Sequence, residues 1–435
     1  MNTKDSTMQA TMQDVNNGLV CLINLGCKVN KYESDCIATM LHDKGYKTTY
    51  DLCKADYYVV NTCAVTNEAE KKSRQHVAKI LKVNPEAKII MCGCACVKNK
   101  HKIAEMKGVV AVVGNTGKEH IADIICGSQE DYFNTPQDIV TLKNPHKSQT
   151  RGYLKIQDGC NRFCTYCLVP YIRGRSISRP LEDVVLQAQS MAHDFKEIVL
   201  TGIDMSDYKI GGEFALAELI RALSHINVRL RISSLEVNVV TKELLEATQQ
   251  LQNFCPSFHL SLQSGSNEIL KKMNRKYTAT EYLEKVALIR QYYPKANITT
   301  DVIVGFAGET EAEFNETVEL CKAVGFGEMH VFPYSKRSGT VSENWKDLDK
   351  AIKKTRSKQL IEIGNALRLD YLKSLSGTKE QVLVEQECNG YMVGYSKSYI
   401  KCYLPLGCKP DTIIDVVLHE PFFDGVRAEP QFVSQ

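Results

Sequence analysis

Short apolar runs alternate with polar stretches of helical spacing in the first part of the chain. Strands are expected at 19–24, 57–60, 88–92 and 109–113. Between them we expect helices over 31–44, with Glu33 and Asp35 in its first turn, and over 67–82. This alternation predicts a small α/β domain with a mostly parallel sheet.

The same alternation resumes at residue 151 and continues over a longer stretch. Six strands are expected near 153–157, 197–201, 229–234, 258–263, 299–304 and 328–333. Six strand–helix units predict a partial TIM-type (β/α)6 barrel, in which the active site lies at the carboxyl ends of the strands. A charged helix is expected over 343–375. From residue 376 the apolar period changes to two, which predicts a small all-β barrel.

These patterns divide the chain into five expected segments. They are a disordered arm at 1–17, an α/β domain at 18–133, a linker at 134–150, the larger barrel at 151–375 and the all-β barrel at 376–435. The arm has no apolar core of a signal peptide, and no apolar run approaches the ~20 residues that cross a bilayer. We therefore expect a cytoplasmic protein without membrane contact.

Seventeen cysteines are the most unusual feature of the composition. A chain of 435 residues is too long to be a small disulfide scaffold, so the excess indicates metal binding. Cys160, Cys164 and Cys167 are spaced so that one loop can hold three irons of a [4Fe–4S] cluster and leave the fourth iron open. Zinc is the alternative, although structural zinc prefers four closed ligands.

A second set of cysteines follows the strands expected in the first domain. Cys27, Cys63 and Cys94 each stand just after such a strand, and the carboxyl ends of parallel strands meet at one edge of a sheet. They predict a second cluster, with three buried core thiols as the alternative. Cys92 and Cys96 flank Cys94, so the third ligand is ambiguous from spacing alone.

The motifs around these cysteines resemble the radical S-adenosylmethionine (SAM) methylthiotransferases from about residue 19 to the end. They lie at 25–34 (LGCKVNKYES), 61–66 (NTCAVT), 156–161 (IQDGCN), 262–266 (LQSGS) and 301–306 (DVIVGF). Further motifs at 26–30, 72–75, 156–159 and 330–335 are most similar to the branch that acts on threonylcarbamoyladenosine in tRNA. Two segments depart from the family pattern, GCACV at 93–97 and GFAGE at 305–309.

The resemblance implies two [4Fe–4S] clusters and SAM as cofactors. The open iron held by Cys160, Cys164 and Cys167, the catalytic cysteines, binds SAM, and one electron cleaves it to a 5′-deoxyadenosyl radical. The second cluster, held by Cys27, Cys63 and Cys94, carries the sulfur to be transferred. Residues implied at the SAM site are Tyr166, Thr201, Gly202, Glu236, Gln263 and Gly305. Their alternatives are a core aromatic for Tyr166 and polar residues of the barrel layers for the others.

The resemblance also implies tRNA as partner, bound at its anticodon loop, an electron donor such as flavodoxin or ferredoxin, and a monomer. The last segment is similar to the RNA-binding TRAM domain, yet it holds five basic and eight acidic residues. Basic residues concentrate instead at 71–102 and 151–179, where they could hold phosphates or form solvated faces. Tyr391, Tyr395, Tyr399 and Tyr403 could stack on bases or fill the barrel core.

Three other functions remain open from the sequence. The first is the sister tRNA branch that acts on isopentenyladenosine, with the same chemistry on another base modification. The second is the branch that methylthiolates an aspartate of a ribosomal protein. The third is an RNA-binding iron–sulfur protein that senses redox state without catalysis. The motifs at 26–30 and 156–159 disfavour the first two, and the open iron above a barrel disfavours the third.

Overall fold

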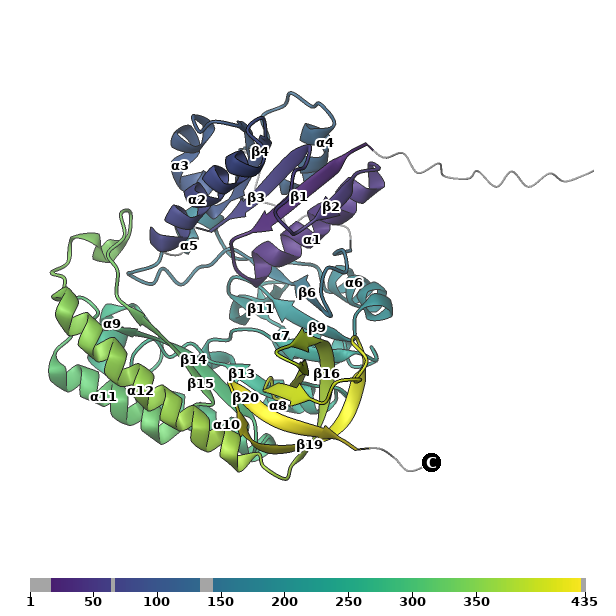
Figure 1. Ribbon diagram of the computed structural model, residues 1–435. Helices are drawn as coiled ribbons and strands as arrows, with labels where there is room; N and C mark the ends of the chain where they lie inside the picture. The colour runs from purple at the N-terminus through teal and green to yellow at the C-terminus, as the bar shows by residue number, and fades with distance from the viewer. Residues whose placement is uncertain (1–16, 64–66, 134–143, 432–435) are drawn as a thin grey trace, which may run out of the picture.

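The computed structural model describes residues 17–63, 67–133 and 144–431 (Figure 1). The arm expected over 1–17 lies almost wholly outside these residues, and so does the first part of the linker expected over 134–150. Of the described helices, none is both long enough and apolar enough to cross a membrane.

The N-terminal part is a parallel sheet of strand order β2-β1-β3-β4-β5 with helices on its faces. Its strands are β1 (Leu19–Asn24), β2 (Lys47–Thr49), β3 (Tyr57–Thr62), β4 (Lys88–Gly93) and β5 (Val109–Val112), and its helices are α1 (Lys28–Asp43), α2 (Asn67–Val83), α3 (Cys94–Ala104) and α4 (Ile121–Ile125). Val59 and Ile90 pack in the core on one face, and Val60 and Met91 pack in the core on the other. The expected parallel α/β domain is confirmed, with β2 as a strand that the sequence pattern did not indicate.

Helix α1 begins three residues earlier than expected. Cys27 caps it in an extended conformation, so the first turn contains Lys28 and no acidic residue. The expectation that Glu33 and Asp35 stand in the first turn is therefore wrong. Both lie one turn further along and are buried, because α1 packs against the rest of the protein there.

The middle part contains six parallel strands in chain order. They are β6 (Arg151–Lys155), β9 (Glu197–Thr201), β12 (Arg229–Ile232), β13 (Ser257–His259), β14 (Asn297–Val304) and β15 (Glu328–Pro333). They form two three-stranded sheets, and isolated parallel bridges from Leu230 to Phe254 and from Leu235 to Leu260 join the two. The expected partial (β/α)6 barrel is confirmed.

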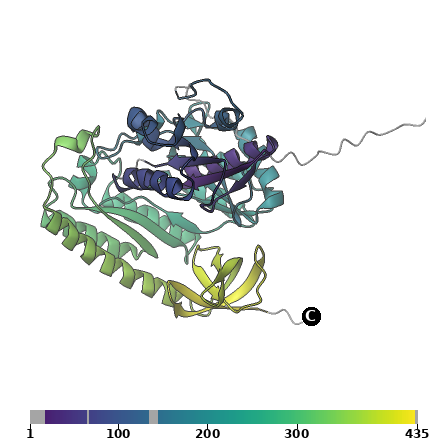
Figure 2. The ribbon, with the colours of Figure 1, turned by 45° about the horizontal axis from the view of Figure 1, so that its top comes forward.

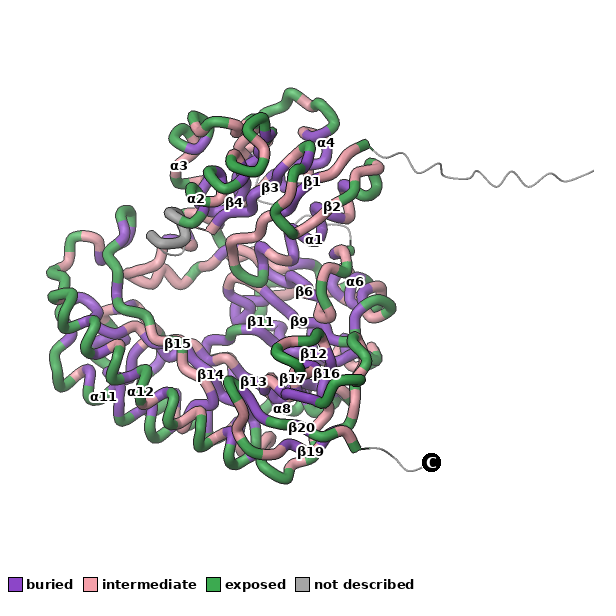
Figure 3. The backbone as a smooth tube through the Cα atoms, in the orientation of Figure 1, coloured by how far each residue is buried: buried purple, intermediate pink, exposed green. Residues whose placement is uncertain are grey.

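Helices cover the outside of this barrel, and the strands between them are mostly buried, apart from β15 (Figures 1 and 3). They are α6 (Leu181–Asp194), α7 (Leu216–Ala222), α8 (Lys242–Gln249), α9 (Asn267–Lys272), α10 (Ala279–Tyr292), α11 (Glu311–Val324) and α12 (Lys350–Ser374). Inserted between β6 and α6 are the short strands β7 (Gln157–Asp158) and β8 (Ile177–Ser178), which pair with each other, and helix α5 (Val169–Arg173). A small hairpin, β10 (Lys209–Ile210) and β11 (Glu213–Phe214), precedes α7.

Helix α12 leads into a closed five-stranded barrel at the C-terminal end, drawn in yellow in Figure 2. Its strands are β16 (Lys379–Cys388), β17 (Tyr391–Ser396), β18 (Lys401–Leu404), β19 (Ile413–Phe422) and β20 (Gly425–Pro430). Val382, Leu404 and Val416 are among its fully buried core residues. Alternating apolar positions predict such a barrel, and the structure confirms it.

Two tyrosines of the C-terminal barrel, expected either to stack on bases or to fill the barrel core, pack instead against arginines of the larger barrel. Tyr395 and Tyr399 stack with ring centroids 4.9 Å apart, and the guanidinium of Arg151 lies 4.7 Å from the first ring and 5.0 Å from the second. Arg231 of β12 lies 4.5 Å from the ring of Tyr399 and donates to the carbonyl of Ser396 at 3.3 Å. The pair therefore docks the C-terminal barrel onto the larger barrel.

Candidate functional site

The carboxyl edge of the N-terminal sheet carries three cysteines. Thr62 of β3 pairs with Gly93 of β4, so Cys63 and Cys94 leave neighbouring strands side by side. Cys27 stands at the N-terminus of α1, just beyond the end of β1, which is the other neighbour of β3. The structure thus brings the three expected residues to one edge of the sheet.

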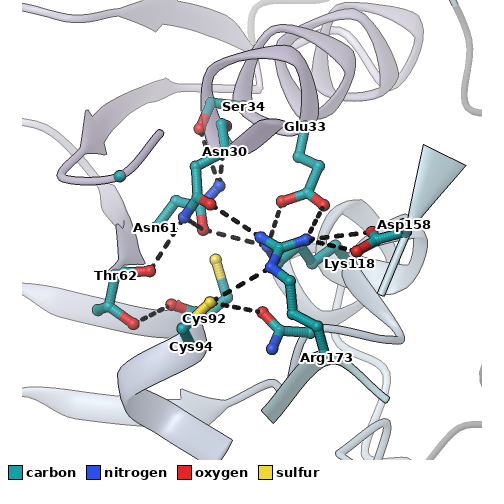
Figure 4. A network of polar contacts seen from close by, with 12 residues as sticks. Asn30, Glu33, Ser34, Asn61, Thr62, Cys92, Cys94, Lys118, Asp158 and Arg173 are labelled. Atoms are coloured by element: carbon teal, nitrogen blue, oxygen red, sulfur yellow. Dashed lines mark hydrogen bonds and ion pairs between the residues drawn. The ribbon is translucent and has the colours of Figure 1, made fainter. Parts of the chain in front are cut away.

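Asn30 links the three cysteine positions through its side-chain amide. Its Oδ1 accepts from the thiol of Cys27 at 3.4 Å, and its Nδ2 donates to the carbonyl of Thr62, the residue before Cys63, at 2.9 Å. The same Oδ1 accepts from Arg173 at 2.8 Å, and the Nε of Arg173 donates to the sulfur of Cys94 at 3.4 Å. One buried amide and one buried guanidinium therefore tie this edge together (Figure 4).

The structure distinguishes Cys94 from the cysteines that flank it. Cys92 lies within β4 and Cys96 within α3, and both are fully buried. Cys96 faces the hydroxyl of Thr62, with 3.8 Å between sulfur and oxygen. Cys94 instead faces the polar edge, where its thiol also donates to Asn115 at 3.5 Å. Its position favours Cys94 as the third ligand.

A buried network of charges extends from this edge into the larger barrel (Figure 4). Arg173 donates to both carboxylate oxygens of Asp158, at 3.0 and 3.1 Å, and to Glu33 at 3.3 Å. Lys155 lies 3.3 Å from Glu33 and 3.1 Å from Asp158, and Lys118 contacts Glu33 directly. Burial alone would raise the pKa of Glu33, but Lys118, Arg173 and Lys155 outweigh it and hold that pKa below its ordinary value.

The second cysteine set stands on a loop that follows β7, and Gly159 fixes the start of that loop. Gly159 has φ +70°, and a Cβ there would lie 1.9 Å from the carbonyl oxygen of Arg175. The N–H of Cys160 donates to the carbonyl of Gly174 at 3.2 Å. Only glycine allows this close approach, which clamps the loop to the segment after α5.

N–H donors surround the three sulfurs of the loop. A backbone N–H donates to the sulfur of Cys160 at 3.5 Å, another donates to Cys167 at 3.4 Å, and the Arg275 guanidinium donates to Cys164 at 3.5 Å. Such donors stabilise thiolates and tune iron–sulfur clusters. Burial raises the pKa of Cys160 to about 12 and that of Cys167 to about 11, so these thiols are protonated until a metal binds and displaces the proton.

Glu236 lies beside this loop, and its contact with SAM stays a prediction. Its two carboxylate oxygens accept from one guanidinium nitrogen of Arg275 at 2.6 Å each, and the same guanidinium contacts Cys164. Arg162, within the loop, lies 3.8 Å from Glu236 and donates to Asp204 at 2.6 Å. Alternating acidic and basic groups therefore line the loop on the side of the barrel strand ends.

Three other residues expected at the SAM site lie at strand ends of the barrel. Thr201 ends β9. A Cβ at Gly202 would lie 3.0 Å from the side-chain oxygen of Gln157, a residue of β7, the strand that leads into the cysteine loop. Gln263 has φ +65°, and its N–H donates to the carbonyl of Asp301 at 2.9 Å. Their place at the carboxyl ends agrees with the expectation, while their contact with SAM stays a prediction.

The remaining two expected residues pack against apolar or charged side chains. The N–H of Gly305 donates to Glu309 at 2.7 Å, and a Cβ at Gly305 would lie 2.5 Å from the stem of Lys353 in α12. Tyr166 packs edge-on against Phe306, with ring centroids 6.2 Å apart. Tyr166 thus has the packing of a core aromatic, and its contact with adenine stays a prediction.

Four of the six basic residues in the stretch at 151–179 are engaged inside the protein and not available for phosphates, while Arg175 is exposed. Lys155, Arg173 and Arg179 are buried, and Arg151 pairs with a glutamate of the C-terminal barrel at 2.8 Å. These charges are used inside the protein, because the stretch runs through the interface between the N-terminal sheet and the larger barrel. The basic residues described within 71–102 are mostly exposed on α2 and α3, so that stretch keeps both interpretations.

Two arginines with central positions stand in motifs that resemble the family, but no role is predicted for them from the sequence. Arg173 follows the cysteine loop within the segment YIRGR, and Arg275 lies within MNRKY at 273–277. Each donates to the sulfur of one expected ligand, Cys94 and Cys164 respectively. A motif around each arginine was the available signal, but their partners lie more than 75 residues away along the chain.

A partial parallel barrel that carries a CxxxCxxC loop at its strand ends defines a radical SAM enzyme. The model of the radical SAM superfamily matches residues 154–321, and that of uncharacterized protein family UPF0004 matches residues 19–114. The solved radical SAM methyltransferase TsrM from Kitasatospora setae has a similar fold, with a TM-score of 0.55 at 14% identity over 75% of this chain and 77% of TsrM.

Relatives along the whole chain identify the family. The threonylcarbamoyladenosine tRNA methylthiotransferase MtaB of Bacillus subtilis is 37% identical, over 88% of this chain and 89% of its own length. The tRNA-2-methylthio-N(6)-dimethylallyladenosine synthase of Thermoanaerobacter sp. (strain X514) is 36% identical, over 83% and 80%. The chain therefore belongs to the radical SAM methylthiotransferases, enzymes that use SAM and two [4Fe–4S] clusters. The two cysteine sets, with their N–H donors, fit that requirement.

Proposed function

We propose that this enzyme adds a methylthio group to C2 of N6-threonylcarbamoyladenosine in the anticodon loop of tRNA. One observation carries the proposal: a single buried network reaches from the first cysteine set to the segment that leads into the second. Arg173 contacts Cys94 of the first set, and it also holds Asp158, two residues before Cys160 of the second. Such a connection holds the two segments together, which suits a reaction that needs two iron–sulfur centres close to each other. The curated relatives of that name support the choice of substrate.

We assign Cys160, Cys164 and Cys167 to the cluster that binds SAM, and Cys27, Cys63 and Cys94 to the second cluster. We assign Tyr166, Thr201, Gly202, Glu236, Gln263 and Gly305 to the SAM site. When bound, the two clusters and SAM would supply one-electron cleavage of SAM and the sulfur to be transferred. A radical is needed because an adenine C2–H has no useful acidity.

The side chains of the protein hold and orient these groups. Arg275 contacts both Glu236 and Cys164, so it fixes the carboxylate beside the cysteine loop. Arg173 and Asn30 fix the edge that carries Cys27 and Cys94. Because Arg173, Arg275 and Glu236 are largely shielded from water, their charges act at close range with little screening.

For the RNA partner, we propose that an exposed aromatic cluster on the C-terminal barrel contacts bases. Phe422 and Phe423 pack 4.4 Å apart, and Phe423 is 69% exposed. Arg427 lies 4.5 Å from the ring of Phe422, and Lys401 lies 5.1 Å from that of Tyr403. Aromatic rings beside cations suit unpaired bases and phosphates.

The domain limits at 17/18, 133/134, 150/151 and 375/376, a monomeric state, a flavodoxin or ferredoxin as electron donor, and a place in the cytoplasm also belong to this proposal. They agree with a tRNA-modifying enzyme that takes single electrons from a soluble carrier. The domain limits and the cytoplasmic location follow from the sequence pattern, and the monomeric state and the electron donor follow from the family resemblance.

Mass spectrometry of nucleosides from total tRNA tests the proposal. Cells without this gene should lose 2-methylthio-N6-threonylcarbamoyladenosine and accumulate the unthiolated nucleoside. The intact gene should restore the product, while the Cys164→Ala variant should not, since it removes an iron ligand. Loss of the methylthio-isopentenyl nucleoside instead would assign the protein to the sister branch. An unchanged set of tRNA nucleosides would refute a tRNA substrate.

A further inference from the structure

A polar cavity of about 510 Å³ opens between the larger barrel, the C-terminal barrel and the start of α1. Its wall includes lumen-facing positions of three adjacent strands. His259 of β13 pairs with Thr299 of β14, which pairs with Glu328 of β15, and Asp301 of β14 pairs with His330 of β15. Lys28, directly after Cys27, lines the cavity from the side of the cysteine edge. The cavity therefore joins the barrel interior to the second cluster site.

Three of the four Lys and Arg side chains that line this cavity are already engaged. Arg231 pairs with Glu197 at 2.8 Å, Arg368 with Glu328 at 3.1 Å, and Lys401 with Asp424 at 3.0 Å. Lys28 is different: within the described ranges it makes no hydrogen bond or ion pair. Its ammonium thus reaches the cavity without a hydrogen-bonded carboxylate, and Asp301 on the same wall is paired with His259 at 3.3 Å.

We propose that Lys28 binds the carboxylate of the threonylcarbamoyl group and so selects this substrate over adenosines with an uncharged N6 group. The inference rests on the proposed function and names the residue that reads the modification. C2 and C6, the carbon that carries N6, flank N1 on the same edge of the purine ring. A side chain next to Cys27 is therefore well placed to hold an N6 substituent while the sulfur chemistry takes place at C2.

The lining of the cavity suits a charged substituent and not a hydrocarbon one. Ile232 is its single aliphatic residue among those described, and the other lining residues are charged, hydroxylic, imidazole or tyrosine side chains. An isopentenyl group would leave the ammonium of Lys28 without a partner, which costs affinity. The threonyl group offers a carboxylate for Lys28 and a hydroxyl for neighbours such as Thr299 and Ser233.

A binding experiment that changes both partners tests the proposal. The probes are two anticodon stem-loop RNAs, one with N6-threonylcarbamoyladenosine and one with its threonyl methyl ester. The wild-type holoenzyme should bind the acid about 10- to 100-fold more tightly than the ester, as expected for a hydrogen bond to a charged group. Lys28→Gln should bind both RNAs with nearly equal affinity, and Lys28→Arg should restore most of the preference.

Changing the RNA keeps the test valid even if a variant loses iron, because the acid and ester are compared on the unaltered protein. Equal affinity of the wild type for acid and ester would overturn the proposal, and so would a full preference in Lys28→Gln. Either result leaves the proposed function standing if the nucleoside analysis shows the methylthio product. Absence of that product while the acid is preferred would instead refute the reaction and keep the binding site.

Discussion

Replacement of Arg173 by methionine is the sharpest test of the network between the two cysteine sets. Methionine keeps the length and removes the charge. The change deletes hydrogen bonds to Asn30 at 2.8 Å, to Asp158 at 3.0 and 3.1 Å, and to Cys94 at 3.4 Å. It leaves the carboxylates of Glu33 and Asp158 with only lysines as cationic partners.

The remaining lysines limit the cost. Lys118 still contacts Glu33, and Lys155 still lies 3.1 Å from Asp158. Removal of one partner from a buried ion pair costs about 3–5 kcal/mol, so we expect the lower end, about 3 kcal/mol, for Arg173→Met. The loss should be local to the sheet edge and the cysteine loop, since those are the elements that the guanidinium joins.

Hydrogen–deuterium exchange with mass spectrometry measures this loss by region. Peptides from β3 and β4 should exchange roughly 100-fold faster in Arg173→Met, the factor that corresponds to about 3 kcal/mol. Arg175→Met is the matched control, because Arg175 stands two residues away and is exposed. It should change exchange by less than about threefold. Equal protection of the two variants would refute a structural role of the Arg173 network.

Two further predictions concern the third ligand and the docking of the C-terminal barrel. Cys94→Ala should lose about half of the bound iron while Cys92→Ala keeps it, because only Cys94 faces the cysteine edge; an iron assay giving the reverse would move the assignment to Cys92. Burial would raise the pKa of Glu197, but Arg231 at 2.8 Å holds it below its ordinary value. Its stabilisation is therefore present above about pH 4.3 and lost as the pH falls through the lowered pKa. Urea unfolding of Glu197→Gln between pH 5 and 3 should show a shallower loss of stability than the wild type, and parallel curves would contradict this reasoning.

Local patterns predict most elements of this fold because their causes are local. Alternation and short apolar runs reflect which face of a strand is buried, so β1, β3, β4, β9 and β15 lie within two residues of their expected bounds. The start of α1 was placed three residues late because its cap is Cys27, whose side chain makes no capping hydrogen bond. The division of the larger barrel into two three-stranded sheets has no clear periodic signal in the sequence, and neither has the short strand β2.

The candidate site divides in the same way. Spacing alone indicates Cys160, Cys164 and Cys167, since one loop holds all three, and strand ends indicate Cys27 and Cys63. Spacing does not decide which of Cys92, Cys94 and Cys96 is the third ligand of the second cluster. The choice depends on which sulfur faces Arg173.

The sequence by itself determined the fold class, the family and the positions of five of the six expected ligand cysteines, because each rests on residues close together in the chain or on strand ends that a parallel sheet gathers. Only the tertiary structure decided where the charges act. Arg173 finds Glu33 and Cys94 across 140 and 79 positions of the chain, and Arg231 finds Ser396 across 165. Ion pairs carry no periodic signature, so the same basic residues that suggested phosphate binding turned out to hold the protein's parts together.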